Sequence, residues 1–169
     1  MLLTPLRVVH IFTGDYDRAE VEPPVLPPRH YEAAAAHIHD RAGRPTDWPD
    51  PRGVALAWGI RVIPSRVVGN ASTDGSAIYY RPALAFDPRL RGLLVWHEIA
   101  HCYLRRHEPD ATESDAWLLS GACVLSWRTA RQMSTEEAAE RQQYAPVWFI
   151  ELRRDFVAWH TLFPFLAAE

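Results

Sequence analysis

Residues 88–106 (PRLRGLLVWHEIAHCYLRR) carry the pattern H-E-x-x-H at positions 97–101. On a helix, His97 and His101 project from one face, so that one nitrogen of each ring can bind the same Zn²⁺ ion. Glu98 lies further around the helix, where it can hydrogen-bond a water molecule on the metal and accept its proton. The segment therefore predicts the centre of a zinc hydrolase.

The surroundings of this pattern favour a buried helix. Asp87 and Pro88 are typical of a helix start, an N-cap acceptor followed by proline at the first helical position. The two histidines fall in register with Leu90, Leu94 and Leu104, on an apolar stripe. Burying two imidazoles and a carboxylate costs free energy unless a partner such as a metal compensates. The alternative interpretation is a pair of core histidines beside a capping or salt-bridging glutamate.

Length and composition indicate one globular domain. The chain has 169 residues, of which 48% are hydrophobic and seven are tryptophan. Its net charge of −3 gives no support for direct nucleic-acid binding. Cys102 and Cys123 form no C-x-x-C pair, which suits free thiols in a reducing cytosol. No secretion signal or membrane span is visible, so we expect a cytoplasmic location.

The chain divides into three parts of this domain. Residues 1–50 predict a strand at 6–12, a proline-rich arm at 13–28 and a helix at 29–42. Residues 51–127 form the predicted core, and residues 128–169 are predicted C-terminal helices. The latter include a capping box at 134–137 that opens one helix, and a last helix at 147–163.

A small sheet of about three strands is expected before the H-E-x-x-H helix. We predict a helix at 51–59, a turn at 69–75, and strands at 60–68, 76–80 and 83–86. The strand at 76–80 is a candidate edge strand for binding an extended substrate. Tyr79 and Tyr80 point to opposite faces of that strand, so one of them at most can contact substrate. Packing roles for both are an equally good interpretation.

A catalytic zinc ion needs a third protein ligand and an open position for water. Glu113 is favoured, because it lies at the start of a second predicted helix, at 113–127, after a short turn. His107 stands where the longer pattern H-E-x-x-H-x-x-G-x-x-H has its third histidine, but Leu104 replaces the glycine that ends the helix. The remaining alternatives are Asp115, with a shorter side chain that is rotated away, and no third protein ligand at all.

Two capping boxes compete at the start of this second helix. A box from Asp110 to Glu113 would engage the Glu113 carboxylate in capping its own helix. A box from Thr112 to Asp115 would leave Glu113 free to bind a metal.

Residues 51–127 resemble the ImmA/IrrE metallopeptidase-like domain. The likeness rests on a small sheet, an H-E-x-x-H helix, and Glu113-Ser-Asp-Ala116 in place of the family's Glu-x-x-Ala. It implies an α+β fold, a small sheet packed on a mostly helical zincin-like domain. It also implies a cytoplasmic zinc peptidase that cleaves one protein, such as a helix-turn-helix repressor. Trp117 departs from the family's usual polar residue, and neither terminal part is matched.

We therefore expect a zinc-dependent endopeptidase. His97, His101 and Glu113 would hold one catalytic Zn²⁺ ion, and Glu98 would be the general base. Imidazole and carboxylate ligands also accept other divalent ions, manganese among them. The rival hypothesis is a regulatory module that keeps the peptidase fold and acts by contact alone, as a sensor or antirepressor.

Overall fold

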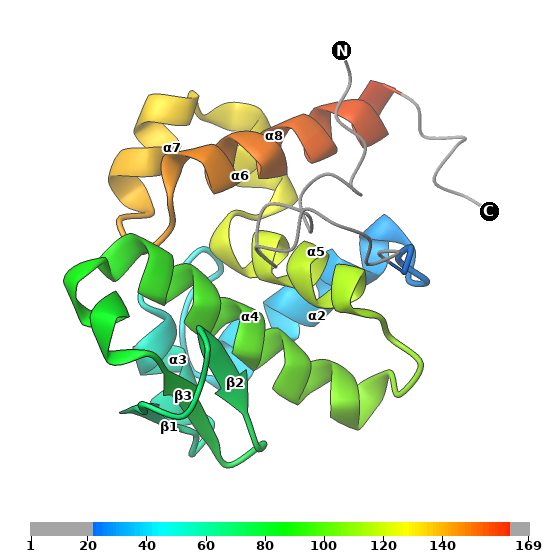
Figure 1. The fold of residues 1–169 in the computed structure, drawn as a ribbon. Coiled ribbons are helices and arrows are strands. Elements are labelled where there is room, and N and C mark those ends of the chain that lie inside the picture. Colours follow the sequence, from blue (N-terminus) through cyan, green and yellow to red (C-terminus); the bar gives the residue numbers. More distant parts are fainter. Residues whose placement is uncertain (1–21, 163–169) are drawn as a thin grey trace.

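The computed structural model describes residues 22–162, which form a mixed α+β fold (Figure 1). The predicted α+β class with a small three-stranded sheet is confirmed. The strand predicted at residues 6–12 lies outside the described residues. In chain order the elements are α2 (Pro28–Arg41), α3 (Pro51–Ala57), β1 (Arg61–Pro64), β2 (Ala71–Thr73), β3 (Ala77–Tyr80), η1 (Pro82–Phe86), α4 (Pro88–His107), α5 (Glu113–Val124), α6 (Trp127–Gln132), α7 (Thr135–Arg141) and α8 (Val147–Leu162).

The sheet has the order β1-β3-β2, with β1 parallel and β2 antiparallel to β3. The prediction that residues 76–80 form an edge strand is therefore wrong, because β3 has a neighbour on each side. The turn predicted at 69–75 is too long, since its middle is β2. Asp74 closes a tighter turn by accepting hydrogen bonds from the backbone N–H groups of Ser76 and Ala77, each at 2.8 Å.

Residues 83–86 form the 3-10 helix η1 and not the predicted strand. Pro82 occupies the first turn of η1, where a fixed φ and a missing N–H are tolerated. The strand predicted at 60–68 shortens to β1, which ends at Pro64.

Helix α4 is the central element of the fold. Figure 1 shows it between the sheet and the helices α5 and α2. It packs against the sheet and α5, and its Trp96 and Tyr103 contact His39 and His37 of α2. Residues 92–100 of α4 are buried all around the helix. A helix that is buried on every side is held in place by its neighbours. This burial explains how α4 can carry functional side chains in fixed positions.

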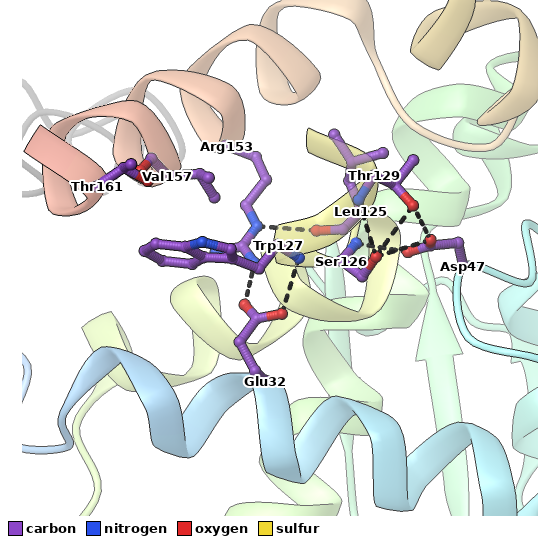
Figure 2. Close-up of polar contacts among 9 residues, drawn as sticks. All are labelled: Glu32, Asp47, Leu125, Ser126, Trp127, Thr129, Arg153, Val157 and Thr161. Carbon is purple, nitrogen blue, oxygen red and sulfur yellow. Dashed lines mark hydrogen bonds and ion pairs between the residues drawn. The ribbon is translucent and has the colours of Figure 1, made fainter. Parts of the chain in front are cut away.

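The helix predicted at 113–127 is interrupted near its C-terminal end, which the sequence does not reveal. The helix predicted at 113–127 ends at Val124, and Ser126 caps a separate helix, α6. Asp47 stabilises the break, because its carboxylate accepts hydrogen bonds from the Ser126 backbone and hydroxyl and from the Thr129 hydroxyl (Figure 2). Asp47 adopts a left-handed backbone with φ of 65°, which aspartate tolerates better than most residues.

A partly buried ion pair joins the N-terminal part of the chain to α8. Arg153 of α8 pairs with Glu32 of α2, and its Nε donates to the Leu125 carbonyl oxygen at 2.9 Å (Figure 2). Glu32 also accepts the Trp127 backbone N–H at 2.9 Å. The capping box predicted from Ser134 to Glu137 is confirmed at the start of α7. One hydrophobic cluster runs from α2 to α8.

No helix within residues 22–162 combines the length and the apolar character needed to cross a bilayer.

Candidate metal centre

Helix α4 begins and continues as its sequence predicts. The Asp87 carboxylate accepts the Leu90 backbone N–H at 2.9 Å, and Pro88 occupies the first turn. The helix then runs for 20 residues, so His97 and His101 lie one turn apart in its middle. Leu94 and Leu104, in register with them, are buried, as the apolar stripe predicted.

The second helix brings Glu113 to these two histidines. The Nε2 atom of His97 lies 2.8 Å from one carboxylate oxygen of Glu113, and the Nε2 atom of His101 lies 3.0 Å from the other. The two Nε2 atoms are 3.0 Å apart. This triad is the one group of three or more metal-binding side chains that residues 22–162 bring within reach of a single ion.

The start of α5 explains why Glu113 is available. The Thr112 hydroxyl and the Asp115 carboxylate form a reciprocal capping box. Of the two boxes considered from the sequence, the one that frees Glu113 is therefore present. Asp115 also accepts hydrogen bonds from the Tyr31 hydroxyl at 2.6 Å and the Leu26 backbone N–H at 3.1 Å. These bonds anchor the first turn of α5, and with it Glu113, to the N-terminal part of the chain.

The two alternative ligands lie elsewhere. Asp115 has its carboxylate engaged in the capping box and its anchoring bonds. His107 is still on α4, which continues past Leu104, and its ring packs on Tyr103 with centroids 4.4 Å apart. The missing glycine thus has the expected effect, since an unbroken helix carries His107 away from the triad.

Glu98 occupies a buried position beside the triad with 6% of its surface exposed. Its carboxylate makes no hydrogen bond or ion pair with another side chain or backbone group in the described part of the chain. Burial raises the pKa of its carboxyl group. The charge of Glu113 raises it further, while His101 and Arg105 act in the opposite direction. A carboxylate with a raised pKa and without a fixed partner has the properties of a general base.

The electrostatics of the triad favour a neutral imidazole at His97 and a charged carboxylate at Glu113. Burial lowers the pKa of His97, although Glu113 opposes the shift. Burial alone would raise the pKa of Glu113, but the hydrogen bonds from His101 and His97 outweigh it and hold that pKa well below its usual range. Metal ligands need these protonation states, a neutral imidazole and an ionised carboxylate.

The donor set fits a divalent transition metal. A tetrahedral zinc ion with bonds of about 2.0–2.1 Å separates its ligand atoms by roughly 3.3 Å. The two Nε2 atoms, 3.0 Å apart, need to open by only a few tenths of an ångström, and each lies 2.8–3.0 Å from one of the two Glu113 carboxylate oxygens. Two nitrogens and one carboxylate oxygen are also the ligand types of catalytic zinc sites that keep a position for water.

Sequence reasoning missed Trp117 as a residue of the site. Its ring stacks on the His97 imidazole, with centroids 3.7 Å apart and planes inclined by 20°. Trp117 follows Glu113 by four residues on α5, so the two share a face of that helix. This spacing was the available signal.

The two tyrosines proposed for substrate binding lie in the sheet. Tyr80 is buried in the core, and the Tyr79 hydroxyl donates to Asp74 at 2.9 Å. Neither makes a hydrogen bond or a ring contact with the described residues of the triad. Cys102 and Cys123 are buried free thiols, as expected.

Comparisons of this chain with protein-family models, with curated proteins and with solved structures found no significant match.

Proposed function

We propose that this protein is a zinc-dependent endopeptidase of the cytoplasm. The observation that carries the proposal is the convergence of His97, His101 and Glu113 from two helices beside a buried carboxylate, Glu98, that has no other partner. A structural zinc site would need a fourth protein ligand. The three donors here leave a coordination position for water, and Glu98 lies next to that arrangement.

In hydrolysis, the triad and Glu98 would have different roles, metal binding and proton transfer. The triad would hold the ion, which when bound polarises the carbonyl of the scissile peptide and lowers the pKa of a coordinated water. Glu98 accepts a proton from the attacking water and returns it to the departing amine, so the carboxyl group ends as it began. The raised pKa of Glu98 suits the first transfer, because a carboxylate with a raised pKa is a stronger base toward the water proton. The resulting carboxylic acid is still a stronger acid than an ammonium group, so it can protonate the departing amine.

Strand β2 supports an extended peptide as the substrate. The Asn70 carbonyl oxygen accepts the Arg81 N–H, and the Asp74 N–H donates to the Ala77 carbonyl oxygen. In an antiparallel pair, alternate residues of a strand direct their backbone groups toward and away from the partner strand. Ala71 and Thr73 therefore direct their backbone groups away from β3. This edge lies along α4, where the Arg105 side chain donates to the Thr73 carbonyl oxygen at 3.2 Å and the Thr73 hydroxyl is 3.3 Å from the Cys102 sulfur. A strand added there would replace the Arg105 hydrogen bond. A peptide strand can add to such an edge by main-chain hydrogen bonds.

The resemblance to the ImmA/IrrE domain suggests the substrate, a helix-turn-helix repressor. The gene for such a repressor would be sought beside the gene for this protein. Direct binding of nucleic acid has no support in the net charge of −3.

The test replaces Glu98 by glutamine. E98Q keeps the shape of the side chain but cannot accept the proton, so we expect cleavage of the neighbouring repressor to fall by about 10²–10⁴-fold while bound zinc stays at the wild-type level. Cleavage is followed by gel and mass spectrometry, and zinc by elemental analysis. E108Q is the matched control, because Glu108 follows α4 but pairs with His30; it should cleave at the wild-type rate.

Wild-type cleavage by E98Q would contradict the role of this carboxylate. A wild-type protein that binds zinc and the repressor without cleaving it would instead support a regulatory module that acts by contact.

A further inference from the structure

A column of contacting aromatic rings connects α8 to the metal centre. Phe149 of α8 meets Trp117 of α5 edge-on, with centroids 6.4 Å apart and planes at 62°. Trp117 in turn lies face to face with His97 at 3.7 Å. All three side chains are at least 95% buried. The column therefore runs through the protein interior and ends on a residue of the triad.

The contact between Trp117 and His97 matters because the Nδ1 atom of the His97 ring has no hydrogen bond within residues 22–162 to hold the ring in place. A metal-binding histidine usually donates its second ring N–H to a carboxylate, a carbonyl oxygen or a water, and that bond fixes the ring plane. The Nδ1 atom of His97 is buried and has no hydrogen-bond partner among the described residues. Rotation about the bond to an imidazole ring has broad minima, so without a restraint the ring plane is poorly defined.

We propose that Trp117 is a positioning residue that takes the place of this hydrogen bond, holding the His97 ring by stacking so that Nε2 stays aimed at the metal. The inference rests on the proposed metal centre. Two effects of the indole act together. Its flat face at van der Waals distance restricts the swing of the ring. Its negative π-face also attracts an imidazole made more positive by a bound metal ion.

The stack also gives the C-terminal helices a part in the site. Phe149 and Arg153 of α8 pack beside Gly121 of α5, one turn beyond Trp117. The closest side-chain atoms would lie 3.2 Å from a Cβ at Gly121, so α8 approaches α5 closely there. The position of α8 thereby limits how far Trp117 can retreat from His97.

The test compares two substitutions at position 117. W117L keeps an apolar side chain but removes the aromatic face, and W117F keeps a smaller face. We expect the Kd for zinc, measured by competition with a chelating dye, to weaken about tenfold or more in W117L and by no more than a few-fold in W117F. W58L is the control, because Trp58 is a partly buried indole that contacts Tyr103 and Arg41 and has no ring contact with the triad. Its Kd should match the wild type.

A second readout reports the contact itself. Cobalt(II) bound at the centre should quench tryptophan fluorescence, and the quenching should be greater in the wild type than in W117F, which lacks the indole nearest the ion. Circular dichroism of the metal-free proteins shows whether W117L folds. If it does not, the comparison of cobalt quenching in the wild type and W117F tests the contact between Trp117 and the metal centre.

Three results would overturn the inference while leaving the metal centre intact: wild-type zinc affinity in W117L, a loss in W117F as large as in W117L, or equal cobalt quenching in the wild type and W117F. Absence of metal binding by the wild type is a different result, which would overturn the proposed function and this inference together.

Discussion

At the scale of single residues, the triad links protonation to stability. The pKa of Glu113 is held below its ordinary value of 4.5 by the hydrogen bonds from His101 and His97. A carboxylate with a depressed pKa stabilises the folded state above its ordinary pKa, and this contribution is lost as the pH falls toward the lower, folded-state value. The lowered pKa of His97 acts in the same direction, because the unfolded chain binds its proton at a higher pH.

We therefore predict that the metal-free protein loses stability on acidification in two windows. Below about pH 6.5, the usual pKa of histidine, His97 contributes, and below the ordinary carboxyl value Glu113 contributes. In E113Q the free energy of unfolding should fall less steeply with pH in the lower window, because glutamine does not titrate. Urea unfolding at a series of pH values, with a chelator present, measures both slopes. Equal slopes below pH 4.5 in E113Q and the wild type would show that Glu113 is not held ionised as the structure indicates.

At the scale of elements, Gly92 marks a close contact of α4 with the segment before α8. A Cβ atom built at Gly92 would lie 2.2 Å from the Tyr144 carbonyl oxygen and 2.7 Å from the Tyr144 Cβ. Neither neighbour is the flexible end of a side chain, so backbone would have to move. The absence of a side chain at Gly92 lets the segment before α8 pack directly on the helix that carries the histidines.

Because of this contact, we predict that replacing Gly92 by alanine lowers the free energy of unfolding, although helix propensity alone would raise it. Alanine in a helix interior is ordinarily more stabilising than glycine, by about 0.5–1 kcal/mol. In G92A the clash with Tyr144 should outweigh that gain and lower the free energy of unfolding by about 1–3 kcal/mol. G53A is the matched control, since a Cβ at Gly53 of α3 meets nothing closer than 3.4 Å; it should be neutral or stabilising. Urea denaturation measures both, and a stabilised G92A would contradict the close packing described here.

The elements that sequence predicted well are those set by local chemistry. The Asp87-Pro88 start fixes α4, and the Thr112–Asp115 box fixes the start of α5, so Glu113 could be chosen as a ligand. Strand β2 was missed because it has only three residues and is defined by pairing with β3. Helix α6 was missed because its cap draws on Asp47, which is 79 residues away in the chain.

The metal ligands could be predicted from local sequence, whereas the role of Trp117 depends on how two helices pack. The spacing of His97 and His101 is a property of one helix, and it survives in any fold that keeps that helix. The stack of Trp117 on His97 depends on how α5 packs across α4, which no local pattern records. The β3 edge prediction was wrong for a similar reason, since edge or centre is decided by the partners of a strand and not by its sequence.

At the scale of the whole molecule, distant parts of the chain support the site. Residues before α2 and Tyr31 hold the first turn of α5 through Asp115. The Glu32–Arg153 ion pair ties α2 to α8 (Figure 2), and α8 backs the stack on His97. Residues 22–50 and the C-terminal helices thus provide the framework that positions the triad.

We propose that one divalent ion binds where α4 and α5 converge, and zinc titration by calorimetry tests this binding most directly. The wild type, first freed of metal with a chelator, should bind one zinc ion per chain. H101A and E113Q, each missing one donor of the triad, should bind at least about tenfold more weakly with unchanged circular dichroism. Binding of unchanged affinity and stoichiometry in both variants, or no binding by the wild type, would contradict the account.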